Sequence, residues 1–171
     1  NHWQIGDWTD DTDMMLCIAD AVIEDKGVDF HNIARHFKNW ADGIPVGIGA
    51  NTFKVLMKGD YVEHPFEVSH KVWKMSKCQS AANGGLMRTS VVGLFPKGIR
   101  TCAENICRLT HYDQRCAGSC VIVSELIHAL VYGQKPTTFF EMMNVSKSYD
   151  DEICHYIEKA WREQSVTSLM D

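Results

Sequence analysis

The chain has 171 residues, of which 45% are hydrophobic and 23% are charged. This length and balance are typical of one folded domain and exclude the disordered and fibrous classes of protein. With 17 basic and 22 acidic side chains the net charge is −5, which argues against a dedicated binder of the nucleic-acid backbone. No apolar run approaches the roughly 20 residues that a membrane-spanning helix needs, and the first residues lack a signal-peptide pattern.

Apolar side chains three and four residues apart predict amphipathic helices over residues 14–23 and 30–40. We expect Thr12 or Asp13 to cap the first of these helices and Asp29 to cap the second. Both helices are expected to turn their apolar faces inward.

Residues 42–52 contain three glycines and a proline, a composition typical of a loop. A short helix is predicted over 53–57, and Pro65 is expected at the first position of another helix that turns Met75 inward. Residues 79–85 cannot form a regular element, because they combine small residues with a glycine pair.

Helical spacing continues in the second half, over residues 99–109, 114–132, 138–143 and 150–163. The only tempting strand is 90–95, and a glycine interrupts it. We therefore predict a single all-α domain with functional loops between its helices.

The seven cysteines are odd in number, and no two of them form a Cys-x-x-Cys pair. Cys102, Cys107, Cys116 and Cys120 have spacings that fit buried helical positions. We interpret the cysteines as reduced thiols of a cytoplasmic protein. A zinc site is the lesser alternative, since no tight cluster of cysteine and histidine supports it.

An acidic turn, Gly6–Asp13, precedes the first predicted helix. Carboxylates of Asp10 and Asp11 beside the Thr9 hydroxyl offer the oxygen ligands that hard divalent cations prefer. The alternative is a simple helix start, where acidic residues are favoured by the helix dipole.

A glycine pair, Gly84 and Gly85, follows Asn83 in the segment Ser80–Arg88. Paired glycines allow the backbone to approach a ligand closely, and successive N–H groups can bind phosphate oxygens. A plain connection between helices is the alternative interpretation.

Two further segments precede predicted helices. Gly47 and Gly49 form a small glycine loop that resembles a phosphate loop, although it matches neither a Walker A motif nor a dinucleotide fingerprint. His111 can donate a hydrogen bond to a ligand or serve as an acid or base. A structural or capping histidine is the alternative.

Taken together, GDWTDDT, ANGGLMRTSVVGL and LTHYDQRCAGSC resemble the ADP-ribosylglycohydrolase family in order and spacing. This family includes the dinitrogenase reductase-activating glycohydrolases and the eukaryotic ADP-ribosyl-acceptor hydrolases. The resemblance covers nearly the whole chain, residues 1–171, and is clearest over 6–132. It implies an all-α orthogonal helical bundle with two Mg²⁺ ions at the bottom of an ADP-ribose cleft.

The resemblance also implies roles for individual residues. Metal ligation falls on Thr9, Asp10 and Asp11, with Asp10 and Asp11 also carrying catalysis. Contacts to the ribose and diphosphate of the substrate fall on Gly47, Gly49, Ser80, Asn83, Gly84, Gly85 and His111. Met87 and Arg88 are expected to support the loop, and Ala81 and Ala82 replace residues that are larger or glycine in some members.

Family members carry an acidic residue in a preceding glycine-rich segment and an Asp-x-Asp-Thr motif near the C-terminus, which complete both metal sites. Neither occurs in this sequence at the matching place. We therefore expect a central fragment that holds half of the metal centre.

The expected activity is Mg²⁺-dependent hydrolysis of the glycosidic bond between ADP-ribose and a protein side chain or another acceptor. The alternatives are an ADP-ribose-binding module without activity and a structural relative, as in certain lens crystallins. ADP-ribose or an ADP-ribosylated protein is the expected partner, and nucleic acid is expected only as an ADP-ribosylated acceptor. The linkage that is cut (to arginine, serine, a nucleic-acid end or a small molecule) and the oligomeric state stay open.

Overall fold

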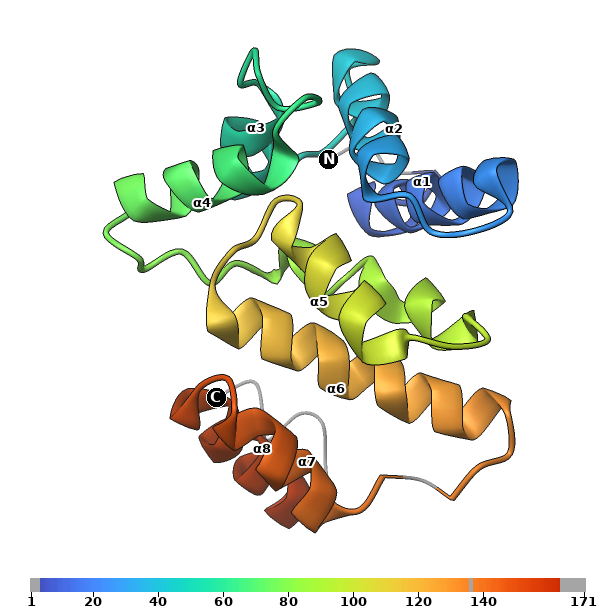
Figure 1. The fold of residues 1–171 in the computed structure, drawn as a ribbon, viewed down its shortest axis with the longest axis vertical. Helices are drawn as coiled ribbons and strands as arrows, with labels where there is room; N and C mark the ends of the chain where they lie inside the picture. Colours follow the sequence, from blue (N-terminus) through green and yellow to red (C-terminus); the bar gives the residue numbers. More distant parts are fainter. Residues whose placement is uncertain (1–3, 136, 164–171) are drawn as a thin grey trace.

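The computed structural model describes residues 4–135 and 137–163, and within these ranges the protein has helices and turns but no strand. Figure 1 shows three tiers: α1 to α4 at the top, α5 and α6 across the middle, and α7 and α8 at the bottom. The predicted all-α fold is confirmed.

The elements are α1 (Asp10–Asp25), α2 (Phe30–Asp42), α3 (Ala50–Leu56), α4 (Pro65–Met75), the 3₁₀ turns η1 (Asn83–Gly85) and η2 (Thr89–Leu94), α5 (Ile99–Arg108), α6 (Gln114–Val131), α7 (Phe139–Lys147) and α8 (Asp151–Arg162).

Helix α1 begins at Asp10, so the prediction that Thr12 or Asp13 caps it is wrong. Thr9 occupies the N-cap position without making a side-chain cap hydrogen bond. The apolar pattern could not locate this start, because it marks only the buried face, whose first member is Met14. Three acidic side chains in the first turn interact favourably with the positive end of the helix dipole and so stabilise the helix start.

Helices α2 and α4 begin as predicted. The carboxylate of Asp29 accepts hydrogen bonds from the backbone N–H groups of His31 and Asn32, and Pro65 occupies the first turn of α4. The inward placement of Met75 is wrong, because its side chain is 73% exposed at the end of α4.

The carboxylate of Asp13 joins α1 to α2. It accepts hydrogen bonds from the indole N–H of Trp40 on α2, at 3.0 Å, and of Trp8, at 2.7 Å. Trp8 lies two positions before the first residue of α1, so this carboxylate also fixes the path of the chain into the helix. Asp13 therefore has a structural role in the described chain.

The segment considered as a strand, residues 90–95, is the 3₁₀ turn η2 followed by Phe95. It lies against α6, where the Ser124 hydroxyl donates to the carbonyl of Thr89 at 3.2 Å. A β-carbon built on Gly93 would lie 2.5 Å from Cγ2 of Ile127 on α6. This close packing against a helix leaves no room for a pairing strand.

Helices α7 and α8 pack on α6 through a small apolar cluster of Ile122, Met142 and Ile153. Thr138 and Glu141 form a capping box at the start of α7, which extends to Lys147, four residues beyond the predicted end. Gly118 of α6, which has no side chain, allows the hairpin formed by α7 and α8 to approach α6 closely.

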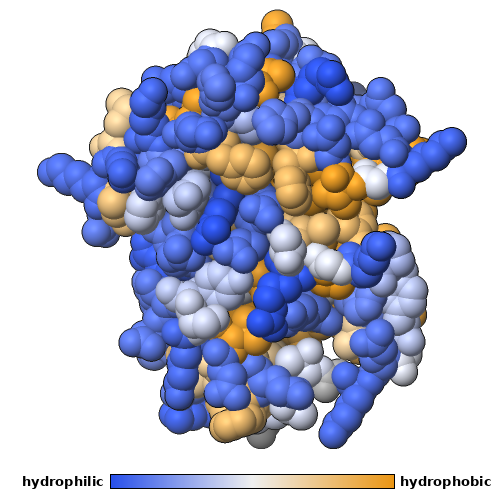
Figure 2. Space-filling view, in the orientation of Figure 1, coloured by the Kyte–Doolittle hydropathy of each residue, from blue (hydrophilic) through white to orange (hydrophobic). Residues whose placement is uncertain are grey.

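Cysteine packing agrees with the interpretation as free thiols. No disulfide links the cysteines of the described chain, and Cys107, Cys116 and Cys120 are buried, while Cys102 is partly exposed. Figure 2 shows a mostly hydrophilic face with hydrophobic residues gathered between the α1–α2 pair and α5. None of the described helices combines the length and apolarity that crossing a membrane requires.

Candidate functional site

The acidic turn and the glycine loop lie next to each other. A β-carbon built on Gly47 would lie 3.8 Å from Oδ1 of Asp10, although the two residues are far apart in sequence. This contact brings the start of α1 to the loop that leads into α3. Two of the segments singled out from the sequence therefore form one surface.

Asp10 is partly buried, and this burial, together with the neighbouring carboxylate of Asp11, raises its pKa. Thr9 donates its hydroxyl hydrogen to Oδ2 of Asp11 at 2.7 Å. The turn thus holds two adjacent carboxylates whose mutual repulsion a bound cation would relieve.

Gly84 packs directly against His111 and Thr52. A β-carbon built on Gly84 would lie 2.8 Å from Cε1 and 3.0 Å from Nε2 of His111, and 3.0 Å from Oγ1 of Thr52. Only glycine fits this place without a shift of its neighbours. Gly85 is buried behind it, where a β-carbon would lie 2.8 Å from Sγ of Cys107.

Asn51 connects the remaining segments. Its Oδ1 accepts a hydrogen bond from the Ser80 hydroxyl at 3.0 Å, and its Nδ2 donates to the carbonyl of Thr110 at 2.9 Å. Asn51 lies in the first turn of α3, just after Gly49. The side chain therefore ties the glycine loop to both the Ser80 segment and the histidine segment.

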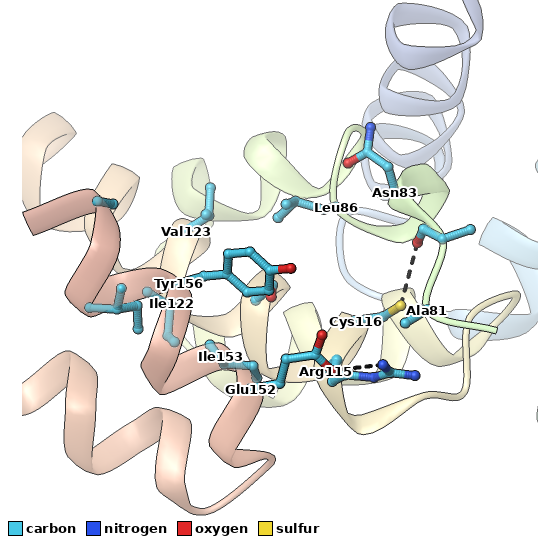
Figure 3. Close-up of a pocket in the computed structure, with 14 residues that line it drawn as sticks. Ala81, Asn83, Leu86, Arg115, Cys116, Ile122, Val123, Glu152, Ile153 and Tyr156 are labelled. Atoms are coloured by element: carbon cyan, nitrogen blue, oxygen red, sulfur yellow. Dashed lines mark hydrogen bonds and ion pairs between the residues drawn. The ribbon is translucent and has the colours of Figure 1, made fainter. Parts of the chain in front are cut away.

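These contacts bring the acidic turn, the glycine loop, the Ser80–Gly85 segment and His111 together. Within this group Gly85 is buried and serves packing, whereas Asn83 is exposed. In Figure 3 the amide of Asn83 points away from Arg115 and Cys116.

Sequence reasoning missed Asn51, Thr52 and Thr110. Each is joined to the network by contacts with segments distant in sequence, such as the Asn51–Thr110 bond across 59 positions. The available signal was modest: two polar residues follow Gly49 where a short helix begins, and a polar residue precedes His111.

The imidazole of His111 is buried, and only one of its two ring nitrogens has a hydrogen-bond partner in the described chain. Nδ1 lies 2.8 Å from Oγ1 of Thr110, while Nε2 is buried with no hydrogen-bond partner in the described chain. Burial, and then the guanidinium of Arg88, lowers the pKa of His111 from 6.5 to about 3. His111 is thus a neutral imidazole near pH 7, which suits hydrogen bonding to a ligand better than proton donation from an imidazolium.

Backbone strain flanks the same loops. Ile44 has a φ of 57° just before the glycine loop, and Lys77 and Cys78 have φ of 55° and 59° just before Ser80. Left-handed backbone is uncommon for such residues and tends to occur at functional segments.

A cavity of about 610 Å³ opens beside Ser80 and Asn51, between α3 and α4. Apolar side chains line much of it, with two lysines from α3 and the residues that follow it; the lining includes Phe53, Lys54, Met57, Lys58, Val72 and Met75. A second cavity, of about 660 Å³, lies on the α6–α8 side of the 81–86 segment and is drawn in Figure 3, where Leu86 and Tyr156 border it. The first of these adjoins the network described above.

A sequence model of the ADP-ribosylglycohydrolase family matches residues 1–170. The chain belongs to this family. The resemblance seen in the three motifs is thereby confirmed, and membership of the ADP-ribosylglycohydrolase family supports hydrolysis of an ADP-ribose linkage as the class of reaction. A comparison with curated proteins finds no match.

The ADP-ribosylglycohydrolase resemblance implies a magnesium centre, and the donors present fit such an ion in kind. Asp10 and Asp11 supply crowded carboxylate oxygens, and a hydroxyl lies beside them. No group of three or more carboxylate, histidine or cysteine side chains within residues 4–135 and 137–163 is arranged to hold a metal. The described residues thus offer part of a set of metal ligands. Asp13 does not add to this set, because its carboxylate already accepts hydrogen bonds from the indoles of Trp8 and Trp40.

Proposed function

We propose that this ADP-ribosylglycohydrolase binds ADP-ribose across the network of the two glycine segments and hydrolyses the bond between its terminal ribose and an acceptor. The observation that carries the proposal is the buried, unpartnered Nε2 of His111 beside Gly84. Buried polar atoms without a partner are rare, and a ligand oxygen at this place would supply the partner.

The arrangement supports a direction for the ligand. Its diphosphate lies along Gly47–Gly49 and the Asn83–Gly84 end of the turn, where the partly exposed glycines carry no side chain that would keep a phosphate from the backbone. The adenosine end enters the 610 Å³ cavity, whose apolar walls suit a flat ring, while Lys54 and Lys58 attract negative charge. The terminal ribose then lies toward Asp10.

Cleavage of a glycosidic bond develops positive charge on the ribose ring. In this proposal Thr9, Asp10 and Asp11 would hold Mg²⁺, and the carboxylates of Asp10 and Asp11 would bind the ion rather than attack the sugar. The chemistry that such an ion would supply is the orientation of ribose hydroxyls and the activation of a water molecule. His111 holds the ligand through a hydrogen bond from its ring, and the glycine segments position the diphosphate.

The substitution Asp10→Asn tests this proposal, with Asp20→Asn as the matched control. Asp20 is an exposed carboxylate on the same helix, far along α1 from the acidic turn. With Mg²⁺ present, we expect Asp10→Asn to abolish release of ADP-ribose from ADP-ribosylated protein and Asp20→Asn to release it at the wild-type rate. Full activity of Asp10→Asn would contradict the assignment.

Two other functions give different results in the same experiments. A binding module binds ADP-ribose in calorimetry but releases none from modified protein. A purely structural relative shows no thermal shift, whereas ADP-ribose at roughly 1,000 times its dissociation constant stabilises a true site by about 4 kcal/mol.

A further inference from the structure

Arg88 is a fully buried cation close to the site. Its guanidinium donates to the carbonyl of Ile106 at 3.1 Å and to Oγ1 of Thr110 at 2.6 Å, and it lies 4.4 Å from the ring centroid of Phe37. None of these partners is a carboxylate. Burial of a charge without a counter-charge is costly in free energy. We therefore expect the guanidinium of Arg88 to hold a neighbouring group in place.

The hydroxyl of Thr110 has a single hydrogen to donate and lies between Arg88 and His111. A guanidinium can only donate, so the hydroxyl oxygen accepts from Arg88. The remaining neighbour of that oxygen in the described chain is Nδ1 of His111, at 2.8 Å. The hydroxyl of Thr110 can therefore donate its hydrogen in a hydrogen bond only if Nδ1 of His111 is the acceptor.

An imidazole whose Nδ1 accepts carries its proton on Nε2. We infer that Arg88 and Thr110 are positioning residues that hold His111 in its Nε2–H tautomer and so leave it a hydrogen-bond donor, beside Gly84, for the ligand. The inference rests on the proposed function for the identity of that ligand, ADP-ribose. Its phosphate and ribose oxygens accept hydrogen bonds, and an ionised phosphate offers no hydrogen in return.

The opposite tautomer leaves two groups unsatisfied. Nδ1–H would donate to Thr110, the hydroxyl hydrogen would have no acceptor among the described residues, and Nε2 would present a lone pair. A lone pair at this position would repel phosphate oxygens. The direction of the relay, from guanidinium to hydroxyl to imidazole, therefore decides which ligand chemistry the site accepts.

NMR tests this inference directly on the whole protein. A long-range ¹H–¹⁵N spectrum of protein labelled at histidine distinguishes protonated from unprotonated ring nitrogens, and His111→Gln identifies the signals of His111. We expect a neutral ring with its proton on Nε2 in the wild-type protein. A wild-type spectrum with the proton on Nδ1, or on both nitrogens near pH 7, would overturn the inference.

Thr110→Val removes the hydroxyl at nearly constant shape, and Thr110→Ser retains it as the matched control. We expect the valine variant to lose the single Nε2–H tautomer and to bind ADP-ribose about tenfold more weakly in calorimetry, as for loss of one oriented hydrogen bond. The serine variant is expected to keep the wild-type spectrum and affinity. An unchanged spectrum and affinity in the valine variant would refute the relay.

The spectra also separate this inference from the proposed function. If wild-type protein shows the Nε2–H tautomer but binds no ADP-ribose, the tautomer assignment stands and both the proposed function and the ligand-donor role fail. If it binds ADP-ribose with the proton on Nδ1, the proposed function stands and the relay fails.

Discussion

At the scale of single residues, His111 lies 1% exposed beneath Gly84, between the hydroxyl of Thr110 and the glycine backbone. Its pKa, lowered to about 3 by burial and by Arg88, has a consequence for folding. Between pH 6.5 and 3 the histidine of the unfolded chain is protonated, but that of the folded chain is not. The unfolded state therefore binds more protons, and stability falls as the pH falls through this window.

We predict that this residue contributes a loss of stability of about 1.4 kcal/mol per pH unit below its unfolded pKa. The free energy of unfolding, measured by urea denaturation between pH 7 and 5, should decline less steeply in His111→Gln than in the wild-type protein. His31→Gln, at an exposed position on α2, is the control and should keep the wild-type slope. Equal slopes in wild type and His111→Gln would show that His111 is protonated in the folded protein.

The sequence indicated the residue types of the site but not their connections. Gly84 and His111 could be singled out because their motifs are distinctive, and the structure places them in contact. The bonding of Asn51 to Ser80 and Thr110 could not be foreseen, since it depends on how α3 packs against distant segments. The burial of Arg88 was equally hidden, because an arginine is normally exposed.

At the scale of elements, the sequence pattern located each α-helix found in the described residues, while the ends and faces of these helices depended on tertiary packing. Met75 is exposed because α4 ends there, beside a cavity rather than against a neighbouring helix. Residues 90–95 pack against α6, where Nδ1 of His128 lies 3.0 Å from the carbonyl of Gly93, so this backbone meets a helix rather than a neighbouring strand. The spacing of apolar residues along the sequence shows neither where a cavity lies nor which helix packs against a segment.

Gly118 of α6 gives an element-scale prediction. A β-carbon there would lie 2.5 Å from Cδ1 of Ile153 and 2.8 Å from Cβ of Tyr149, and the latter atom cannot move without its backbone. Gly118→Ala should lower the free energy of unfolding by about 1–2 kcal/mol, even though alanine favours a helix.

Chemical denaturation measures this change, with Gly59→Ala as the matched control. No atom lies within 4 Å of the position where a β-carbon would be added to Gly59, so that variant should unfold at nearly the wild-type denaturant concentration. A Gly118→Ala protein as stable as the wild type would mean that α8 packs on α6 less closely than described.

At the scale of the whole molecule, the site belongs to the upper and middle tiers, and the α7–α8 pair stands apart from it (Figure 1). The main apolar core draws on α1 to α6, whereas the α7–α8 hairpin shares with α6 the separate cluster of Ile122, Met142 and Ile153. Such a small cluster gives this region a lower local stability than the main core.

We predict that amides of 139–162 exchange with deuterium before those of α5 and α6, in hydrogen-exchange mass spectrometry under native conditions. Gly118→Ala should accelerate exchange in 139–162 further while leaving α1 and α2 near their wild-type rates. Uniform exchange across all the described helices would show instead that the protein opens as one cooperative unit.

The carboxylate of Asp13, shared by Trp8 and Trp40, has one further consequence. Two fluorophores are hydrogen-bonded to a group only two positions from Asp11, and Trp8 is 58% exposed. Indole emission responds to nearby charge and solvent, so occupation of the acidic turn by a cation would alter the colour and intensity of the light that these rings emit. The fluorescence of Trp8 and Trp40 would therefore report whether a cation occupies the acidic turn, without an added dye.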